Sequence, residues 1–216
     1  MGSKTSPAVR VSLYRLFWVF FMGCFLGVVM ETLWCYISRG YWASRTGLVY
    51  GPFNLVYGFG AALMTLCLCR VRTCAGCFVG GFVLGSIFEY LCSWVQEALF
   101  GTVSWQYDVR CNLNGRINLI YSLFWGVLAV IWIRFLYPAL CCRLDRLSSS
   151  VTRPLAWVLA AFILWDTAVS AAAVGRWSAR RAGCPAANSA EELLDERFDD
   201  ARMEQIYPNM IFLSHP

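Results

Sequence analysis

The sequence predicts an all-α fold: a polytopic bundle of transmembrane helices. The chain has 216 residues, of which 59% are hydrophobic and 14% charged, and its mean hydropathy is +0.55. A soluble domain cannot bury that much apolar surface. The apolar residues also form runs of about 20 residues, the length a helix needs to cross a bilayer. Because backbone groups in lipid must be hydrogen-bonded internally, these runs are expected to be helices.

The apolar runs predict about five spans. They cover residues 11–37, 48–69, 73–100, 117–140 and 154–175. Few ionisable residues interrupt them, chiefly Glu31 in the first run, Glu89 in the third and Asp166 in the fifth. The first run is too long for a signal peptide and contains a glutamate, so we expect it to be retained.

The chain divides into a transmembrane domain, residues 1–175, and a polar C-terminal tail, residues 176–216. In the tail, Ser189 and Glu192 have the spacing of a capping box, and apolar residues follow at helical spacing. We therefore expect a short amphipathic tail helix, docked on its own protein or on the membrane surface.

Several functional classes are excluded by composition. The only histidine is His215, which removes HExxH zinc sites and histidine-based triads. The pattern GxxxxGK[ST] is absent, so the chain carries no P-loop ATPase of its own. Basic residues are scattered at span ends, which does not fit nucleic-acid binding. Most of the 11 cysteines lie in apolar runs, so we expect no metal and no cofactor.

Two motifs recur in the same order along the chain. GCFLGVVMETL, residues 23–33, aligns with GFVLGSIFEYL, residues 81–91. GPFNLVY, residues 51–57, aligns with GRINLIY, residues 115–121. We therefore expect two parallel two-helix repeats, related by an axis along the membrane normal. They cover about residues 11–69 and 73–140, and the fifth helix, about 154–175, is an addition.

The first motif places small residues and an acid on one helical face. Gly23, Gly27 and Glu31 are four residues apart, and the copy of this stripe ends in Glu89. Small residues at this spacing let transmembrane helices approach closely. We expect the first and third spans to touch along the stripe, which would bring the two glutamates together.

The polar residues converge on one half of the membrane. A carboxylate in a bilayer costs several kcal/mol unless it is paired or hydrated, so we expect a polar intramembrane site between the two repeats. The candidate substrate-binding residues are Glu31, Glu89, Asp166, Asn54, Asn118, Tyr57, Tyr121, Asp108, Asn112, Asn114 and Arg116. The alternative is a buried network that satisfies the acids and fixes the helix packing.

Arg116 breaks the repeat, since Pro52 stands at the equivalent position. A guanidinium there can clamp a carboxylate or phosphate with two hydrogen bonds. It can equally neutralise Glu89, and the sequence does not decide between these roles.

Several segments resemble a known family. ETLWCY, GPFNLVYGFGA, FEYLCSW, WQYD and NLNGRINLIYSLFWG are similar to the bacterial membrane proteins labelled "putative ABC-transporter permease, type IV" (CmpB-like). The likeness extends through WDTAVS to MEQIYPNM in the tail. The resemblance implies a bacterial inner-membrane protein of about five helices with a role in transport.

We favour a small-solute permease or transport component, which would need a separate ATP-binding subunit or an ion gradient. One alternative is an integral-membrane enzyme acting on a lipid headgroup or lipid-linked substrate. Its general acid or base would be Glu31, Glu89 or Asp108, with Arg116 as anion clamp. The other is a structural or accessory protein. We expect a multi-pass protein of the cell membrane in contact with lipid. The distribution of Lys4, Arg10, Arg110 and the other basic residues favours a cytoplasmic N-terminus.

Overall fold

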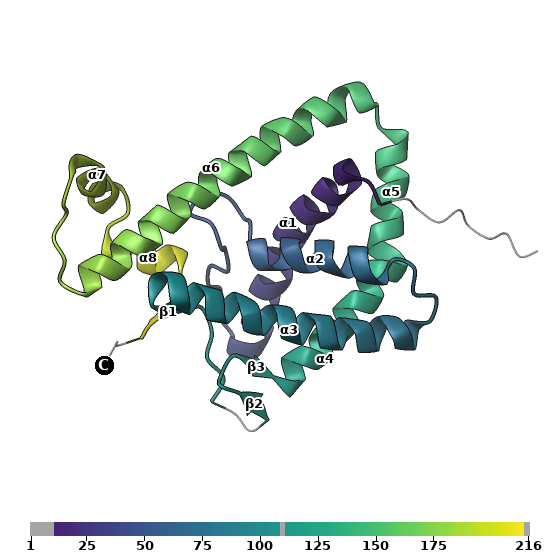
Figure 1. Ribbon diagram of the computed structural model, residues 1–216, viewed down its shortest axis with the longest axis horizontal. Helices are drawn as coiled ribbons and strands as arrows, with labels where there is room; N and C mark the ends of the chain where they lie inside the picture. The colour runs from purple at the N-terminus through teal and green to yellow at the C-terminus, as the bar shows by residue number, and fades with distance from the viewer. Residues whose placement is uncertain (1–10, 109–110, 214–216) are drawn as a thin grey trace, which may run out of the picture.

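The computed structural model describes residues 11–108 and 111–213 and is mainly helical (Figure 1). Lys4, Arg10, Arg110 and His215 lie outside the described residues. The main helices are α1 (Leu13–Arg39), α2 (Leu55–Leu68), α3 (Cys74–Phe100), α4 (Leu119–Ile131), α5 (Tyr137–Arg146) and α6 (Ser149–Arg181). A π-helical turn, η1 (Trp132–Leu136), joins α4 to α5 without a break.

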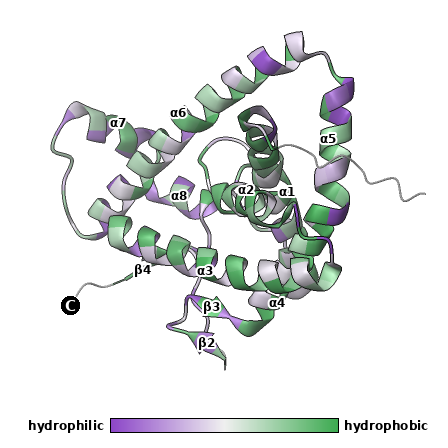
Figure 2. Ribbon diagram, turned by 45° about the vertical axis from the view of Figure 1, so that its right-hand side comes forward, coloured by the Kyte–Doolittle hydropathy of each residue, from purple (hydrophilic) through white to green (hydrophobic). Residues whose placement is uncertain are grey.

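Four helical runs in the described residues are long and apolar enough to cross a membrane. They are α1, α3, the continuous run Leu119–Arg146, and α6. The fifth apolar helix, α2, is shorter. Figure 2 shows hydrophobic residues along the long helices and hydrophilic ones at helix ends, the hairpin and the tail. The predicted all-α transmembrane bundle is confirmed.

Helix α2 begins about two turns later than the span predicted from residue 48. Pro52 lacks an N–H and disfavours helix at the residue before it. Asn54 then caps the helix, because its side chain accepts the Val56 N–H at 3.0 Å. The Asn54 N–H donates to the carbonyl of Cys24 at 3.1 Å, near the middle of α1. The non-helical segment 40–54, which we call the entry segment, therefore runs back along α1 before α2 starts.

The helices form two pairs, α1 with α2 and α3 with α4. Each glycine stripe packs against the other helix of its own pair and not against the other pair. A Cβ on Gly27 would lie 2.1 Å from the Tyr57 ring of α2. A Cβ on Gly85 would lie 2.3 Å from the Trp125 ring of α4. Consistently, α1 packs chiefly on α2 and α3 on α4. The expectation that the stripes bring the first and third spans together is wrong, because large aromatic residues of the following helices fill those positions.

The two helix pairs make similar contacts that differ by one helical turn. Asn54 and Asn118 both cap the second helix of a pair. Tyr57 packs on the first glycine stripe three residues after its cap, whereas Trp125 packs on the second stripe seven residues after its cap. The residue that meets Gly85 is therefore not Tyr121, the partner of Tyr57 in the sequence alignment. An extra turn of α4 separates the two.

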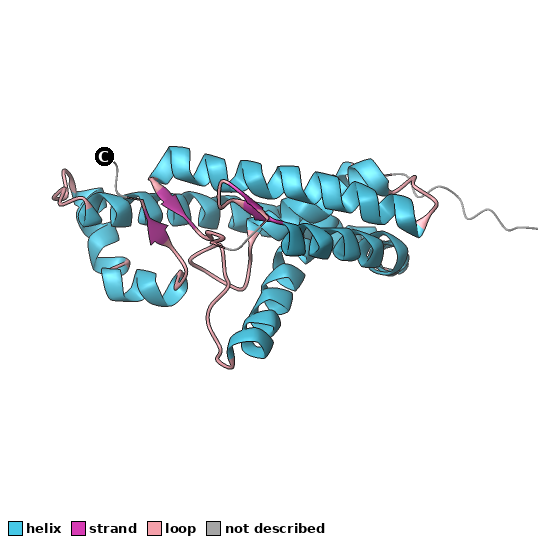
Figure 3. Ribbon diagram, turned by 90° about the horizontal axis from the view of Figure 1, so that it is seen from below, coloured by secondary structure: helices cyan, strands magenta, loops and turns pink. Residues whose placement is uncertain are grey.

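Two short strand pairs accompany the helices (Figure 3). The pairs are β2 (Asn112–Leu113) with β3 (Ile117–Asn118), and β1 (Thr102–Val103) with β4 (Ile211–Phe212), both antiparallel. The first pair is a hairpin whose turn residues Asn114 and Gly115 have φ of 53° and 69°. Positive φ at both positions is typical of an Asn-Gly hairpin turn, a signal that the prediction of a simple span entry overlooked.

The polar tail forms two helices, α7 (Ser189–Arg197) and α8 (Asp200–Ile206), where one was expected. The cap of α7 is Asn188, one residue before the predicted Ser189. Arg176 of α6 binds Asp195 of α7 with nitrogen–oxygen distances of 2.8 and 2.9 Å. Both tail helices lie at the end of α6, with α8 on the side that faces α3 and α7 on the other side (Figure 1), so the tail docks on its own protein.

Candidate functional site

Glu89 is the most completely bonded acid of the transmembrane region. It lies on α3 and is 6% exposed. Its Oε1 accepts the Tyr107 hydroxyl at 2.7 Å, and its Oε2 accepts the Trp125 Nε1–H at 2.9 Å. Both oxygens therefore have a donor, as a buried carboxylate requires.

Glu31 approaches Glu89 from the other helix pair. The Tyr57 side chain contacts the Glu31 carboxylate, and the two glutamates are close enough to interact electrostatically. Tyr57 stacks on Trp125 with ring centroids 6.0 Å apart. The sequence-based expectation that the two acids lie near each other agrees with this geometry, although an aromatic pair joins them in place of glycine contact.

Two further tyrosines border this cluster. The rings of Tyr107 and Tyr121 stack with centroids 4.8 Å apart. Tyr107 lies in the loop after α3, where burial, and then the nearby charge of Glu89, raise the pKa of its hydroxyl. The hydroxyl therefore keeps its proton at neutral pH and remains a donor to Glu89.

Arg45 is a member of the site that the sequence-based prediction missed. It lies in the entry segment and is 9% exposed. Its Nη2 donates to Cys35 Sγ at 3.0 Å, and its Nε has no partner among the described residues. Among the positive charges, Arg45 interacts most strongly with the Glu31 carboxylate. Its place in a loop between spans is typical of an interface charge, so only the burial of the entry segment reveals it.

The cluster formed by Glu31, Arg45, Tyr57, Glu89 and Trp125 is called the acid–arginine cluster below. It combines two carboxylates, from α1 and α3, with a buried guanidinium. A buried arginine without a full set of acceptors is costly and is uncommon unless it has a function.

The predicted asparagines are structural caps. Asn54 Oδ1 accepts the Val56 N–H at 3.0 Å, and Asn118 Oδ1 accepts the Ile120 N–H at 2.7 Å. The Asn54 side-chain amide also donates to the carbonyl of Arg45 at 3.3 Å. Asn54 therefore positions the entry segment, and both asparagines satisfy the first N–H groups of a helix.

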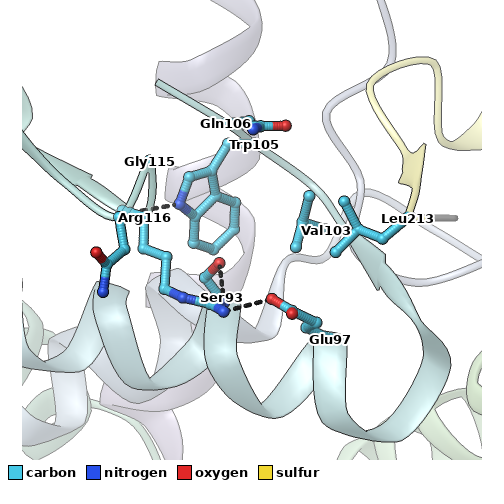
Figure 4. Close-up of a pocket in the computed structure, with 9 residues that line it drawn as sticks. Ser93, Glu97, Val103, Trp105, Gln106, Gly115, Arg116 and Leu213 are labelled. Carbon is cyan, nitrogen blue, oxygen red and sulfur yellow. Dashed lines mark hydrogen bonds and ion pairs between the residues drawn. The ribbon is translucent and has the colours of Figure 1, made fainter. Parts of the chain in front are cut away.

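Arg116 belongs to a separate pocket (Figure 4). It forms an ion pair with Glu97, and its Nη1 donates to Ser93 Oγ at 3.2 Å. Trp105 Nε1 donates to its carbonyl at 2.9 Å. The pocket holds about 60 Å³, room for water-sized groups only. Arg116 thus neutralises Glu97. Of the two roles left open by the sequence, neutralisation of Glu89 is wrong, because the hairpin places the guanidinium beside Ser93 and Glu97, one and two turns after Glu89 on the same face of α3.

The remaining polar residues of this region shape or border the hairpin. Asn112 Oδ1 accepts the Gly115 N–H at 2.8 Å, and Asn114 Nδ2 donates to the Tyr90 hydroxyl at 3.3 Å. Asp108 is exposed in the loop before the hairpin. These contacts place Asn112 and Asn114 in the hairpin and beside Tyr90.

Asp166 is also apart from the glutamates. It lies on α6, is fully buried, and accepts the Tyr50 N–H at 3.2 Å and the Ser170 hydroxyl at 3.3 Å. Within residues 11–108 and 111–213, no group of three or more His, Cys, Asp or Glu side chains could hold a metal ion. The sequence-predicted site is therefore divided into three places: the acid–arginine cluster, the Arg116 pocket and Asp166.

Comparison with known proteins gives one match. The family model described as "Putative ABC-transporter type IV" matches residues 18–171. Searches of curated proteins and of solved structures found no match.

Proposed function

Because this chain belongs to the family described as "Putative ABC-transporter type IV", we propose that it is the permease or a membrane component of a transporter. It is a multi-pass membrane protein, with four helices long and apolar enough to cross a bilayer. Its sequence lacks a P-loop motif, so ATP-driven transport would need a separate ATP-binding subunit. The bacterial inner membrane and a cytoplasmic N-terminus are part of this proposal.

The acid–arginine cluster is the observation that carries the proposal. Its carboxylates come from α1 and α3, the first helices of the two pairs, and its aromatic bridge from α2 and α4. The similar contacts of the two pairs support an internal repeat with a polar site at its interface, where sites of repeat-built transporters often lie.

The members of the cluster differ in how many of their polar atoms already have hydrogen-bond partners. Glu89 has a donor on each oxygen and serves as a fixed charge or proton store. Arg45 has an Nε that finds no partner among the described residues, and its guanidinium can bind an anionic group of a small solute. Glu31 lies between them and can bind a cationic group or exchange a proton as the solute passes.

The lipid-enzyme alternative has less support. Glu89 would have to release Tyr107 or Trp125 to act as a base, and Arg116 is already held by Glu97. The pocket beside Arg116 is also too small for a lipid headgroup.

The proposal is tested by isolating the tagged chain from its native membrane and assaying ATP hydrolysis. We expect an ATP-binding subunit to co-purify with the chain. Glu31→Gln and Arg45→Gln should leave this complex intact and change its rate of ATP hydrolysis several-fold. Glu192→Gln, at an exposed tail position, is the control and should change nothing. If no ATP-binding subunit co-purifies, or if the cluster variants hydrolyse ATP as wild type does, the proposal fails.

A further inference from the structure

The entry segment is attached to the middle of α6 by two polar side chains. Its Val49 N–H donates to Ser170 Oγ at 2.9 Å, and its Tyr50 N–H donates to Asp166 Oδ1 at 3.2 Å. Ser170 lies one helical turn after Asp166 and donates to the same oxygen. Asp166 and Ser170 therefore face the entry segment from a long apolar helix.

Asp166 lacks the partners that a buried carboxylate needs. Its residue is 0% exposed, and its Oδ2 has no hydrogen-bond partner among the described residues. Of the ion pairs found in the described chain, none includes it. An uncompensated carboxylate in a membrane interior costs several kcal/mol, so a positive charge or a proton must reside there.

Neutral oxygen atoms from two other segments meet near this part of α6. The Tyr207 hydroxyl, from the tail, contacts the carbonyl oxygen of Gly47 at 3.3 Å and lies close to Ser170 and Asp166. Burial raises the pKa of Tyr207, so its oxygen is a neutral ligand. The carboxylate, two hydroxyls and a backbone carbonyl are the oxygen types that hard cations prefer.

These two hydrogen bonds are long, and the spacing of their oxygens also fits a shared cation. The Ser170–Asp166 and Tyr207–Gly47 oxygen pairs are each 3.3 Å apart. Hydrogen bonds between oxygens are usually about 2.7–2.8 Å long. Oxygens around a hard cation at about 2.4 Å are roughly 3.4 Å from their neighbours.

We propose that Asp166 is the anionic ligand of a sodium-sized monovalent cation, with Ser170, Tyr207 and the Gly47 carbonyl as neutral ligands. One positive charge balances the single carboxylate, whereas a divalent ion would leave a net charge in the membrane. In other transporters, carbonyls of unwound membrane segments coordinate sodium in this way. The inference concerns a separate site and does not rest on the proposed transport function.

The cation would link three parts of the molecule: α6, the tail through Tyr207, and the entry segment through Gly47. The entry segment also carries Arg45, two residues before Gly47 in the sequence. Binding of the cation would therefore order the segment that positions the buried guanidinium.

The test is the melting temperature of the purified full chain in detergent at constant ionic strength, with choline chloride replaced stepwise by sodium chloride. Ligand binding to the folded state raises the melting temperature. We expect a saturable rise of about 3 °C by 100 mM sodium, and a smaller rise with potassium. Asp166→Asn should abolish the rise, and Asp145→Asn, an exposed carboxylate paired with Arg15, should retain it.

A second variant keeps the test decisive if Asp166→Asn does not fold. Ser170→Ala retains the carboxylate and should shift the half-saturating sodium concentration upward by about tenfold. The inference is overturned if choline and sodium act alike, if the rise persists without Asp166, or if Ser170→Ala titrates as wild type. It is also overturned if the melting temperature does not change with sodium and rises only on acidification, since Asp166 would then hold a proton.

Discussion

The rings of Tyr57 and Trp125 stack with centroids 6.0 Å apart and an interplanar angle of 28°. Tyr57 contacts Glu31, and Trp125 donates to Glu89 at 2.9 Å. The stack therefore joins the acids of two helix pairs into one cluster. Each ring also fills the space above a glycine, so packing and polar chemistry depend on the same two side chains.

Gly85→Ala should strongly destabilise the second helix pair. The new Cβ would lie 2.3 Å from the Trp125 ring, and relieving such a clash costs about 3 kcal/mol. Gly175→Ala on α6 is the matched control, because its Cβ would meet only Phe100 at 4.0 Å. Alanine also favours helix over glycine, so this control should be neutral or stabilising. Thermal unfolding in detergent measures both, and equal melting temperatures would contradict the packing account.

Glu89→Ala should destabilise the protein more than Glu89→Gln. Alanine leaves the buried Tyr107 hydroxyl and Trp125 N–H without acceptors, which costs about 2–4 kcal/mol. Glutamine keeps an acceptor for Trp125, and its amide can donate to the Tyr107 oxygen. Melting temperatures of the two variants should therefore differ by several degrees. Similar values would mean that the two hydrogen bonds contribute little to stability.

Arg45→Met should separate stability from function. Methionine removes the cost of burying the guanidinium, and the Glu31 carboxylate that loses this positive charge can take up a proton and become neutral. We expect an unchanged or higher melting temperature together with loss of the ATP hydrolysis linked to transport. Arg72→Met, in the loop before α3, serves as a control for removal of an arginine charge. Loss of folding in Arg45→Met alone would instead assign Arg45 a structural role.

The docking of the tail should weaken in acid. The pKa of Asp195 is lowered, mainly because Arg176 hydrogen-bonds its carboxylate, whereas in the unfolded chain it is about 3.9. The stabilisation is therefore complete above the unfolded value and is lost as the pH falls through the lower folded value. Hydrogen exchange of α7 should increase below about pH 4. Asp195→Asn should show fast exchange already at neutral pH, and a pH-independent wild type would contradict this assignment.

Apolar run length located the long helices, because bilayer thickness fixes how many residues a span needs, but it gave 154–175 for α6, which is Ser149–Arg181. The third span was expected at 73–100, and α3 is Cys74–Phe100. Run length could not locate the start of α2, since residues 48–53 are apolar but not helical. The entry segment ends at Pro52 and at the helix cap Asn54, and both signals can be read in the sequence.

The candidate site was only partly predictable. Unusual acids inside apolar runs pointed to Glu31 and Glu89, which the Tyr57–Trp125 stack connects. Asp166 lies elsewhere because α6 packs on the entry segment, a tertiary contact without a periodic signal. Arg45 was missed for the same reason, and Arg116 was misplaced because the Asn-Gly turn of a hairpin redirects it towards Glu97.

The central claim is that the acid–arginine cluster is a site reached by solute from water. Cys35 is 2% exposed and its sulfur accepts a bond from Arg45 at 3.0 Å, so a water-soluble reagent reaches it only if water enters the cluster. The measurement is labelling by a charged, membrane-impermeant thiol reagent in native membranes, with Cys35 as the only cysteine. A variant retaining only Cys24, which is 0% exposed between α1 and α2, is the control. We predict that Cys35 is labelled and Cys24 is not. If Cys35 is as unreactive as Cys24 until the protein is denatured, the cluster is a dry packing network and the claim is contradicted.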